Sequence, residues 1–467
     1  MKLNDGFLTA ISSLLPASQV LTDSVSIALY AQDWSNVLVP HAKAILFPKT
    51  TLEVSQILKI ATLHHQTIVP SGGRTGLSGG AVATQNEVVL SLEKLNFIGP
   101  IHEGSLSLHV GAGAITEAVH DHCKPYGLTW PVDFASKGSS QVGGNIATNA
   151  GGVRVLRYGS TRNWVLGLTS VTMDGTVHQF NGELEKNNTG VDFRHLLIGS
   201  EGILAVITEA TLKLCALPQS RLVFLFALEN FSEVVKLFSY ARKNILNLSA
   251  FECMDEACFQ VTTRHLGITP PLKAPTQNGH GTYVLLEIQN ENFERAEKWL
   301  TEVFENDYVS DGVMAQSEKD VETFWKIREG IAESILHNHE VHQEDVSVPI
   351  QKLEAFYSDI HSRYQKEYSE YEIFFFGHIG DGNLHVFIRK PKTMDSSQFI
   401  KMAHESDLKL FETLAQYHGS VSAEHGIGLL KKHAIHFSRT PLELQMFMKL
   451  KSIFDPQGLL NPGKIIQ

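Results

Sequence analysis

Two long segments rich in glycine and hydroxyl side chains constrain this chain more than any other feature. They read "PSGGRTGLSGG" at residues 70–80 and "PVDFASKGSSQVGGNIATNAGG" at residues 131–152. Because both contain few large apolar residues, core burial is not expected to offset the entropy cost of ordering them. We therefore expect a bound ligand to order both segments.

The first segment has the composition of a phosphate-binding loop. Glycines let a backbone approach a ligand closely, and successive N–H groups form a concavity that binds anions. Ser71, Arg74 and Thr75 add donors suited to a pyrophosphate. The loop matches neither the GxGxxG nor the Walker pattern, and a plain surface loop is the alternative for this segment alone. Together with the second segment and "IGSEGILAVIT" at residues 198–208, it favours a large extended cofactor.

The stretch "GHIGDGNLHV" at residues 377–386 predicts a β-hairpin. Asp381-Gly382 is a strong two-residue turn signal between apolar, β-prone runs. A two-residue loop would set His378 directly opposite His385, close enough for both imidazoles to bind one metal ion. A polar pair on a solvated face is the alternative.

A third metal ligand is found in "SAEHGIG", where Glu424 precedes His425 and the glycines that allow a turn. Two imidazoles and one carboxylate leave an open coordination position, as a catalytic metal needs. We therefore expect His378, His385 and Glu424 to bind a divalent metal.

Arg328 lies on an apolar helical stripe in "DVETFWKIREGIAESIL". A charge on such a face must meet an anion, because burying it unpaired is costly. That anion is either a structural carboxylate or a substrate carboxylate held bidentately by the guanidinium.

Length and composition limit the remaining possibilities. The 467 residues predict two or three domains, and the net charge of −11 argues against nucleic acid or an anionic membrane as the main partner. Four cysteines without CxxC spacing predict reduced thiols, as in a cytoplasmic protein. The beginning of the sequence is too polar for a signal peptide, and no membrane span is expected. The pattern of strands and helices indicates an α+β chain.

These segments together resemble the vanillyl-alcohol-oxidase/PCMH family of flavoproteins with an FAD-linked oxidase C-terminal region. The resemblance rests on the two glycine-rich segments, "GSEG", "GHIGDGNLH", "SAEHGIG" and the terminal "NPGK". It implies an N-terminal helical segment (1–37), a two-subdomain PCMH-type FAD-binding domain (38–218), an α+β substrate or cap domain with an antiparallel sheet (219–425) and a helical C-terminal segment returning to the FAD domain (426–467).

Within the family, the chain is most similar to the branch of D-2-hydroxyglutarate and D-lactate dehydrogenases. This implies oxidation of a D-2-hydroxy acid to the 2-oxo acid by hydride transfer to flavin N5, with zinc as the expected metal and manganese as the alternative. His425 would be the general base and Arg328 would hold the substrate carboxylate. The FAD would be non-covalent, since the first loop has no histidine. The residues expected to bind it are Pro70, Ser71, Gly72, Gly73, Arg74, Thr75, Gly76, Pro131, Gly138, Ser139, Gly143, Asn145, Thr148, Gly152, Ile207 and Asn461.

Three positions depart from the pattern of the relatives that prefer 2-hydroxyglutarate. Gln343, Ala332 and Phe387 stand where those relatives have lysine, threonine and asparagine. The loss of these polar groups leaves open which D-2-hydroxy acid is preferred.

The alternatives are a D-lactate dehydrogenase and the FAD subunit of a glycolate-oxidase-type complex. An alkyl-glycerone-phosphate synthase is remote, because no His-His-His run is present. The electron acceptor would be an electron-transfer flavoprotein, a quinone or a cytochrome, and a homodimer is possible.

Overall fold

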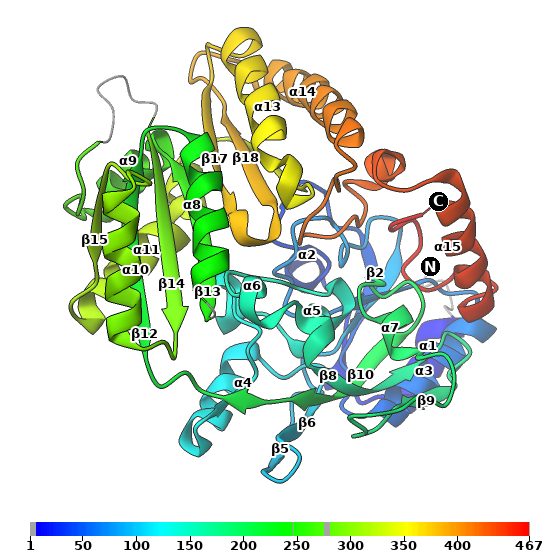
Figure 1. Cartoon of the computed structure of the whole chain (residues 1–467). Coiled ribbons are helices and arrows are strands. Elements are labelled where there is room, and N and C mark those ends of the chain that lie inside the picture. Colours follow the sequence, from blue (N-terminus) through cyan, green and yellow to red (C-terminus); the bar gives the residue numbers. More distant parts are fainter. Residues whose placement is uncertain (1–5, 246, 275–280, 467) are drawn as a thin grey trace. The chain divides into compact units, whose positions relative to one another are not determined.

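The computed structural model describes residues 6–245, 247–274 and 281–466 (Figure 1). The chain forms two compact units. Unit 1 comprises Met1–Gly152, Gly159–Leu217 and Glu424–Gln467, and unit 2 comprises Val153–Tyr158 and Pro218–Ala423. Among the described residues, no helix is both long and apolar enough to cross a lipid bilayer.

Unit 1 begins with a small sheet in a βαβ arrangement. Three of its strands are parallel and the first is antiparallel, in the order β1 (Val20–Leu21), β2 (Ala42–Leu46), β4 (Glu87–Ser91), β3 (Ile68–Ser71). Helix α3 (Thr51–Leu63) connects β2 to β3 and buries an apolar stripe of Val54, Ile57, Leu58 and Ala61. The strand β3 thereby delivers the chain directly into the first glycine-rich segment.

A capping box at the start of α3 forms only in part. The Thr50 side chain accepts a hydrogen bond from the Glu53 N–H, as expected for an N-cap. The Glu53 carboxylate, however, accepts from the Lys49 N–H at 2.7 Å and from Gln19 at 3.0 Å. The reciprocal half of the box is lost because these donors compete for the carboxylate.

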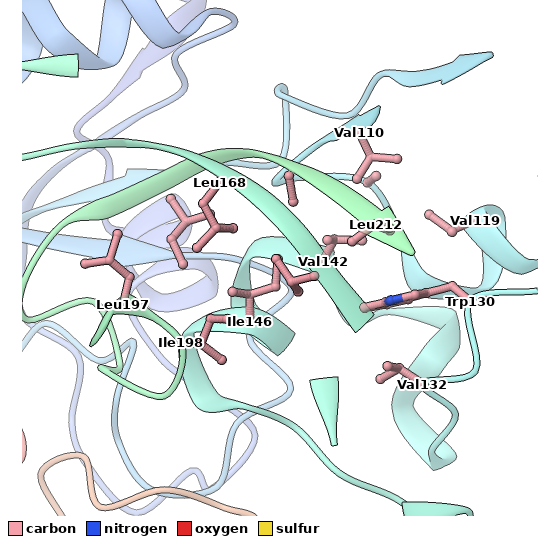
Figure 2. Close-up of a cluster of buried hydrophobic side chains, with 14 of the residues drawn as sticks. Val110, Val119, Trp130, Val132, Val142, Ile146, Leu168, Leu197, Ile198 and Leu212 are labelled. Atoms are coloured by element: carbon pink, nitrogen blue, oxygen red, sulfur yellow. The ribbon is translucent and has the colours of Figure 1, made fainter. Parts of the chain in front are cut away.

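The other strands of unit 1 form a second, antiparallel sheet and one short pair. The short pair is β7 (Leu128–Thr129) with β11 (Cys215–Ala216). The order of the sheet is β5 (Ile98–His102), β6 (Ser107–Gly111), β10 (Val206–Lys213), β8 (Val165–Val171), β9 (Val177–Phe180). Figure 2 shows part of the apolar cluster beneath it, where the buried Trp130 packs with side chains of β6, β8 and β10. The β8–β9 hairpin turns at Asp174-Gly175.

The second glycine-rich segment differs in part from the expectation. Its middle forms helix α5 (Val142–Thr148), and Val142 and Ile146 are buried in the cluster of Figure 2. Two apolar residues one helical turn apart are enough to anchor one short helix. Residues 131–140 and 149–152 form no long helix or strand on either side of it.

Unit 2 is built on a seven-stranded antiparallel sheet (green to orange in Figure 1). Its order is β15 (Asp311–Met314), β12 (Arg221–Leu228), β14 (Thr282–Gln289), β13 (Leu248–Asp255), β17 (Glu372–His378), β18 (Asn383–Arg389), β16 (Val341–Ser347). The β-branched and aromatic runs of these strands are buried on both faces, so helices must cover both.

One face of this sheet carries the side chains considered below. It packs against α9 (Glu256–Leu266), α11 (Glu318–Glu329) and α12 (Ile331–Leu336) in one apolar cluster. Aromatic contacts join the other face to α8 (Phe231–Asn244), α10 (Phe293–Glu305) and α13 (Leu353–Glu367), and α14 (Ser396–Gln416) contacts β16.

The remaining helices of the described residues are short or peripheral. They are α1 (Gly6–Leu14), α2 (Ser24–Tyr30), α4 (Thr116–Cys123), α6 (Val155–Tyr158), α7 (Arg194–Leu197) and α15 (Pro441–Phe454). The α+β prediction is confirmed, including the large antiparallel sheet in the C-terminal half.

The N-cap of α9 makes the stability of unit 2 depend on pH. Asp255 accepts from the N–H groups of Cys258 and Phe375, both at 2.8 Å, and burial raises the pKa of its carboxyl to about 6. Its folded-state pKa thus exceeds the ordinary value of 3.8. The group's contribution to stability is fully present below pH 3.8 and is lost as the pH rises to about 6, for a total of about 3 kcal/mol.

We expect Asp255→Asn to remove this pH dependence. Between pH 4.5 and 7.5 the free energy of unfolding of the variant should rise relative to wild type by roughly 2 kcal/mol, measured by chemical denaturation at both pH values. Asp395→Asn is the matched control, because Asp395 caps α14 but is exposed and has a pKa lowered from 3.8. Its contribution to stability is already fully present above pH 3.8, so the difference between this variant and wild type should stay nearly constant from pH 4.5 to 7.5. Equal pH dependence in wild type and Asp255→Asn would contradict the assignment.

Candidate active site

The two glycine-rich segments of unit 1 pack directly against each other. A Cβ atom on Gly73 would overlap the carbonyl oxygen of Ser139, and one on Gly72 would lie 3.5 Å from the Gln141 side-chain oxygen. Residue 73 must therefore be glycine for the backbones to come this close. Most residues of the first loop after β3 and of the segment that leads into α5 are half-buried or exposed.

Four buried polar atoms in the two glycine-rich segments and the terminal "NPGK" have no hydrogen-bond partner among the residues that the structure describes. They are Ser71 Oγ, Gln141 Oε1, Asn461 Oδ1 and Lys464 Nζ. Buried polar atoms are rarely left unpaired, so they indicate a ligand that supplies hydrogen-bonding groups. Ser71 and Asn461 are among the predicted cofactor-binding residues. Gln141 lies within the second glycine-rich segment but is not one of the predicted cofactor-binding residues, because a glutamine in such a loop has no sequence signature of its own.

Asn461 connects the C-terminal segment to this region. Its backbone N–H donates to Ile68 at 2.7 Å, and its side-chain amide donates to the carbonyls of Gly80 at 3.1 Å and Glu201 at 2.8 Å. The segments 70–80, 198–208 and the C-terminal "NPGK" therefore meet within unit 1. The donor set and the close-packed glycine backbone fit a large dinucleotide cofactor.

Other predicted cofactor residues have partners within the protein. Asn145 is buried and donates to Thr116 at 2.7 Å, so it holds the start of α4. The Arg74 guanidinium lies 4.5 Å from the centre of the Tyr30 ring and 3.9 Å from the Glu93 carboxylate. These contacts fix the two side chains at the edge of the glycine-rich region.

Glu201 is a residue of unit 1 whose role the sequence did not reveal. Its carboxylate accepts from the N–H groups of Ile427 and Gly428, both at 2.7 Å, and burial raises its pKa. It therefore fixes the turn that directly follows Glu424 and His425. Directly before this turn, the His425 Nε2 and a Glu424 carboxylate oxygen are 3.7 Å apart.

The histidine hairpin of unit 2 is present, but its predicted register is wrong. His385 pairs with Phe376 rather than His378, because a 3₁₀ turn at Ile379–Asp381 lengthens the connection beyond two residues. Gly382 closes this turn in the left-handed region (φ 83°), which glycine adopts most readily. A shift of two residues leaves both histidines on the same face, since side chains alternate along a strand.

His378 and His385 are thus diagonal neighbours. Both are buried, and their ring centres are 5.4 Å apart with the planes at 84°. The spacing brings the two imidazoles within reach of one ion, although the residues do not pair directly. Burial also argues against the alternative of a polar pair on a solvated face.

A buried carboxylate that the sequence did not reveal lies between this hairpin and Arg328. Glu252 on β13 lies directly opposite His378 on the neighbouring strand β17, and its Oε2 is 2.6 Å from His378 Nδ1. The same oxygen is 2.7 Å from Arg328 Nη2. Arg328 is buried as predicted, with its guanidinium 5.3 Å from the centre of the Phe376 ring. It therefore has a structural carboxylate partner, while its buried Nε has none among the described residues.

Asp345 on β16 takes a similar position beside the second histidine. Its Oδ1 lies 3.7 Å from His385 Nδ1 and accepts from Asn383 at 2.8 Å. Its Oδ2 accepts from the Ala423 N–H at 3.0 Å. Asp345 therefore fixes, within unit 2, the residue that directly precedes Glu424 in the chain.

The three positions that depart from the 2-hydroxyglutarate pattern are apolar or lie beside apolar residues. Gln343 pairs with Phe387 across β16 and β18. The Phe387 ring is 5.0 Å from the Phe376 ring beneath Arg328, and Ala332 packs against the same cluster. The side chains around Phe376 and Phe387, next to the histidine hairpin, are therefore mainly hydrophobic.

A separate group of possible metal ligands lies on the other face of the sheet. His342, Glu344 and Asp407 each offer one ligand atom, and these atoms lie within 4.8 Å of one another. His342 Nε2 is 2.6 Å from Asp407 and 3.7 Å from Glu344, so ion pairing already explains the contacts. The group serves below as a control.

Comparison with known proteins assigns both halves of the chain. A family model described as an FAD binding domain matches residues 42–181, and one described as the C-terminal domain of FAD linked oxidases matches residues 217–465. The D-2-hydroxyglutarate dehydrogenase of Stutzerimonas stutzeri is 41% identical over 459 residues, which cover 97% of each chain. A putative mitochondrial D-lactate dehydrogenase of Schizosaccharomyces pombe is 36% identical over 97% of this chain and 87% of its own.

Solved structures show the same fold at low sequence identity. The crystal structure of p-cresol methylhydroxylase with substrate bound superimposes with a TM-score of 0.77 at 16% identity, covering 99% of this chain and 96% of that chain. This likeness confirms the predicted PCMH-type fold.

Proposed function

We propose that this chain, which belongs to the family of FAD-linked oxidases with an FAD-binding domain, is an FAD- and divalent-metal-dependent D-2-hydroxyacid dehydrogenase. One observation carries the metal and substrate parts of this proposal. The buried pair His378 and His385 lies beside a buried arginine that keeps an unpaired donor. Imidazoles that bind a cation and a guanidinium that binds a carboxylate are the groups that a 2-hydroxy acid requires.

Each group has a defined role in the proposal. His378, His385 and Glu424 hold a divalent cation, zinc in our proposal, which lowers the pKa of a substrate hydroxyl beside it. Arg328 binds the substrate carboxylate and thereby orients the Cα–H bond. His425 accepts the hydroxyl proton as general base. When bound, FAD supplies the acceptor for the two electrons and the Cα hydrogen, so that the alcohol becomes a 2-oxo acid.

The FAD is held by the glycine-rich segments of unit 1 in this proposal. Ser71, Gln141 and Asn461 supply the buried atoms that need partners. Since residues 70–80 contain no histidine, we propose that the cofactor is not covalently attached through this loop. An electron-transfer flavoprotein, a quinone or a cytochrome would reoxidise it, and we retain a cytoplasmic homodimer as part of the proposal.

The side chain of the substrate separates two candidates. Identity to D-2-hydroxyglutarate dehydrogenases favours a second carboxylate on the substrate. The hydrophobic wall of Phe376 and Phe387 instead favours a short apolar side chain, as in D-lactate. An apolar wall discriminates against an unpaired carboxylate because desolvating that charge is costly.

The test is anaerobic reduction of the bound flavin by a panel of hydroxy acids, followed as loss of the oxidised-flavin absorbance. We expect D-2-hydroxyglutarate or D-lactate to reduce the flavin and their L enantiomers to be at least roughly 100-fold slower, since orientation controls the reaction. A higher kcat/KM for D-lactate would favour the second candidate. Absence of reduction by every D-2-hydroxy acid would contradict the proposed function.

A further inference from the structure

Glu252 occupies a position that strand pairing alone determines. β13 and β17 pair so that Glu252 and His378 are directly opposite, and the two side chains lie on the same face of the sheet. The side chain of Glu252 is only 1% exposed. A carboxylate at this depth, held between an arginine and a histidine, interacts with both more strongly than it would in water.

The contact with His378 determines which nitrogen can bind a metal. Glu252 Oε2 lies 2.6 Å from His378 Nδ1. Arg328 Nη2 also lies 3.5 Å from this nitrogen, but the 2.6 Å contact with Glu252 is much the shorter of the two. A carboxylate beside a guanidinium is an acceptor, so we place the proton of the neutral imidazole on Nδ1, which donates to Glu252. The lone pair of Nε2 is then directed away from Glu252, and the ring cannot rotate without breaking the hydrogen bond.

The contact with Arg328 comes from the same oxygen. Arg328 Nη2 forms an ion pair with Glu252 Oε2 at 2.7 Å, and the guanidinium lies over the Phe376 ring. These contacts leave the buried Nε without a partner among the described residues. One carboxylate oxygen therefore fixes both a proposed metal ligand and the proposed substrate clamp.

We propose that Glu252 is the positioning residue that couples the metal centre to the carboxylate clamp. The inference rests on the proposed function. Glu252 touches neither metal nor substrate in this scheme. It holds the imidazole of His378 and the guanidinium of Arg328 in one fixed relative geometry, so that hydroxyl and carboxylate of one substrate are bound together.

The matched control is Glu287 on the neighbouring strand β14. It is equally buried and pairs with Arg154 Nε at 3.0 Å, but it contacts neither histidine of the hairpin in the described structure. Glu252→Gln and Glu287→Gln thus each remove one buried charge of similar depth from the same sheet. A purely structural role would give both variants the same effects.

The experiment measures Zn²⁺ affinity of the FAD-loaded protein by competition with a chromogenic chelator, without substrate. We expect Glu252→Gln to weaken Zn²⁺ binding by roughly 10- to 100-fold, as for other partners of metal-binding histidines. It should also raise KM for the D-2-hydroxy acid, while Glu287→Gln leaves both values near wild type. Glu252→Asp, which keeps the charge but is shorter, should show smaller losses of both and serves if the glutamine variant does not fold.

Two outcomes would overturn the inference and are distinct from each other. If wild type and Glu252→Gln bind Zn²⁺ equally well with equal KM, or if Glu287→Gln weakens both as much, Glu252 has no positioning role and the proposed function stands. If wild type itself binds no Zn²⁺ although its flavin is reduced by substrate, the proposed metal centre is wrong and the inference fails with it.

Discussion

Removal of divalent metal with EDTA is expected to lower flavin reduction by D-2-hydroxy acids at least roughly 100-fold, with FAD still bound. A cation beside the substrate hydroxyl stabilises the developing negative charge by several kcal/mol, and the general base alone cannot supply this. The FAD-binding residues of unit 1 include none of the proposed metal ligands, so the flavin spectrum should remain. Adding Zn²⁺ or Mn²⁺ back should restore the rate, measured by stopped-flow absorbance alongside metal analysis.

The location of the metal is tested by two variants that differ only in which group they disrupt. His385→Ala removes a proposed ligand and should reproduce the effect of EDTA without responding to added metal. Asp407→Ala disrupts the separate group of His342, Glu344 and Asp407 and should keep the metal and the activity. Loss of metal from Asp407→Ala but not from His385→Ala would place the metal on the other face of the sheet and would contradict our proposal. Full activity of metal-free protein would remove the metal from the mechanism.

The sequence correctly placed both histidines of the hairpin on one face of the sheet in spite of the wrong register. The turn signal Asp381-Gly382 is local, but the 3₁₀ turn that actually forms also depends on Val348, whose N–H donates to the Gly382 carbonyl. Because the side-chain period of a strand is two, an error of two residues moved His385 along the sheet without moving it to the other face.

The partners of these residues could not be predicted in the same way. Glu252 is 126 residues from His378 in the sequence, and only the pairing of β13 with β17 brings them together. Glu201 and Ile427 are 226 residues apart. Local spacing carries no information about such pairings, whereas glycine-rich loops and histidine pairs have signatures of their own.

Arg328 shows how a sequence argument can be correct and incomplete. Its place on an apolar stripe required a buried anion, and the structure supplies Glu252. That anion had been one of two alternatives with the substrate carboxylate. The two alternatives are compatible, because one guanidinium has five donors and the contact with Glu252 uses only Nη2.

Replacement of His425 by alanine is expected to slow flavin reduction by D-2-hydroxy acids by roughly 10²- to 10⁴-fold, the range for loss of a general base. The alcohol must lose its hydroxyl proton as the Cα hydrogen leaves, and alanine cannot accept it. The turn around His425 should persist, because Glu201 accepts its hydrogen bonds from the backbone of Ile427 and Gly428 rather than from the side chain. FAD content and Zn²⁺ affinity should therefore stay near wild type.

The matched control is His433→Ala, which removes an exposed imidazole from the same C-terminal segment of unit 1 and should leave the rate unchanged. The comparison is made by single-turnover absorbance at saturating substrate, so that weakened binding cannot imitate a slower chemical step. If His425→Ala loses rate together with FAD or Zn²⁺, the side chain has a structural role. If it reduces the flavin at a rate near wild type with both retained, the proton goes to another group, and His425 is not the base.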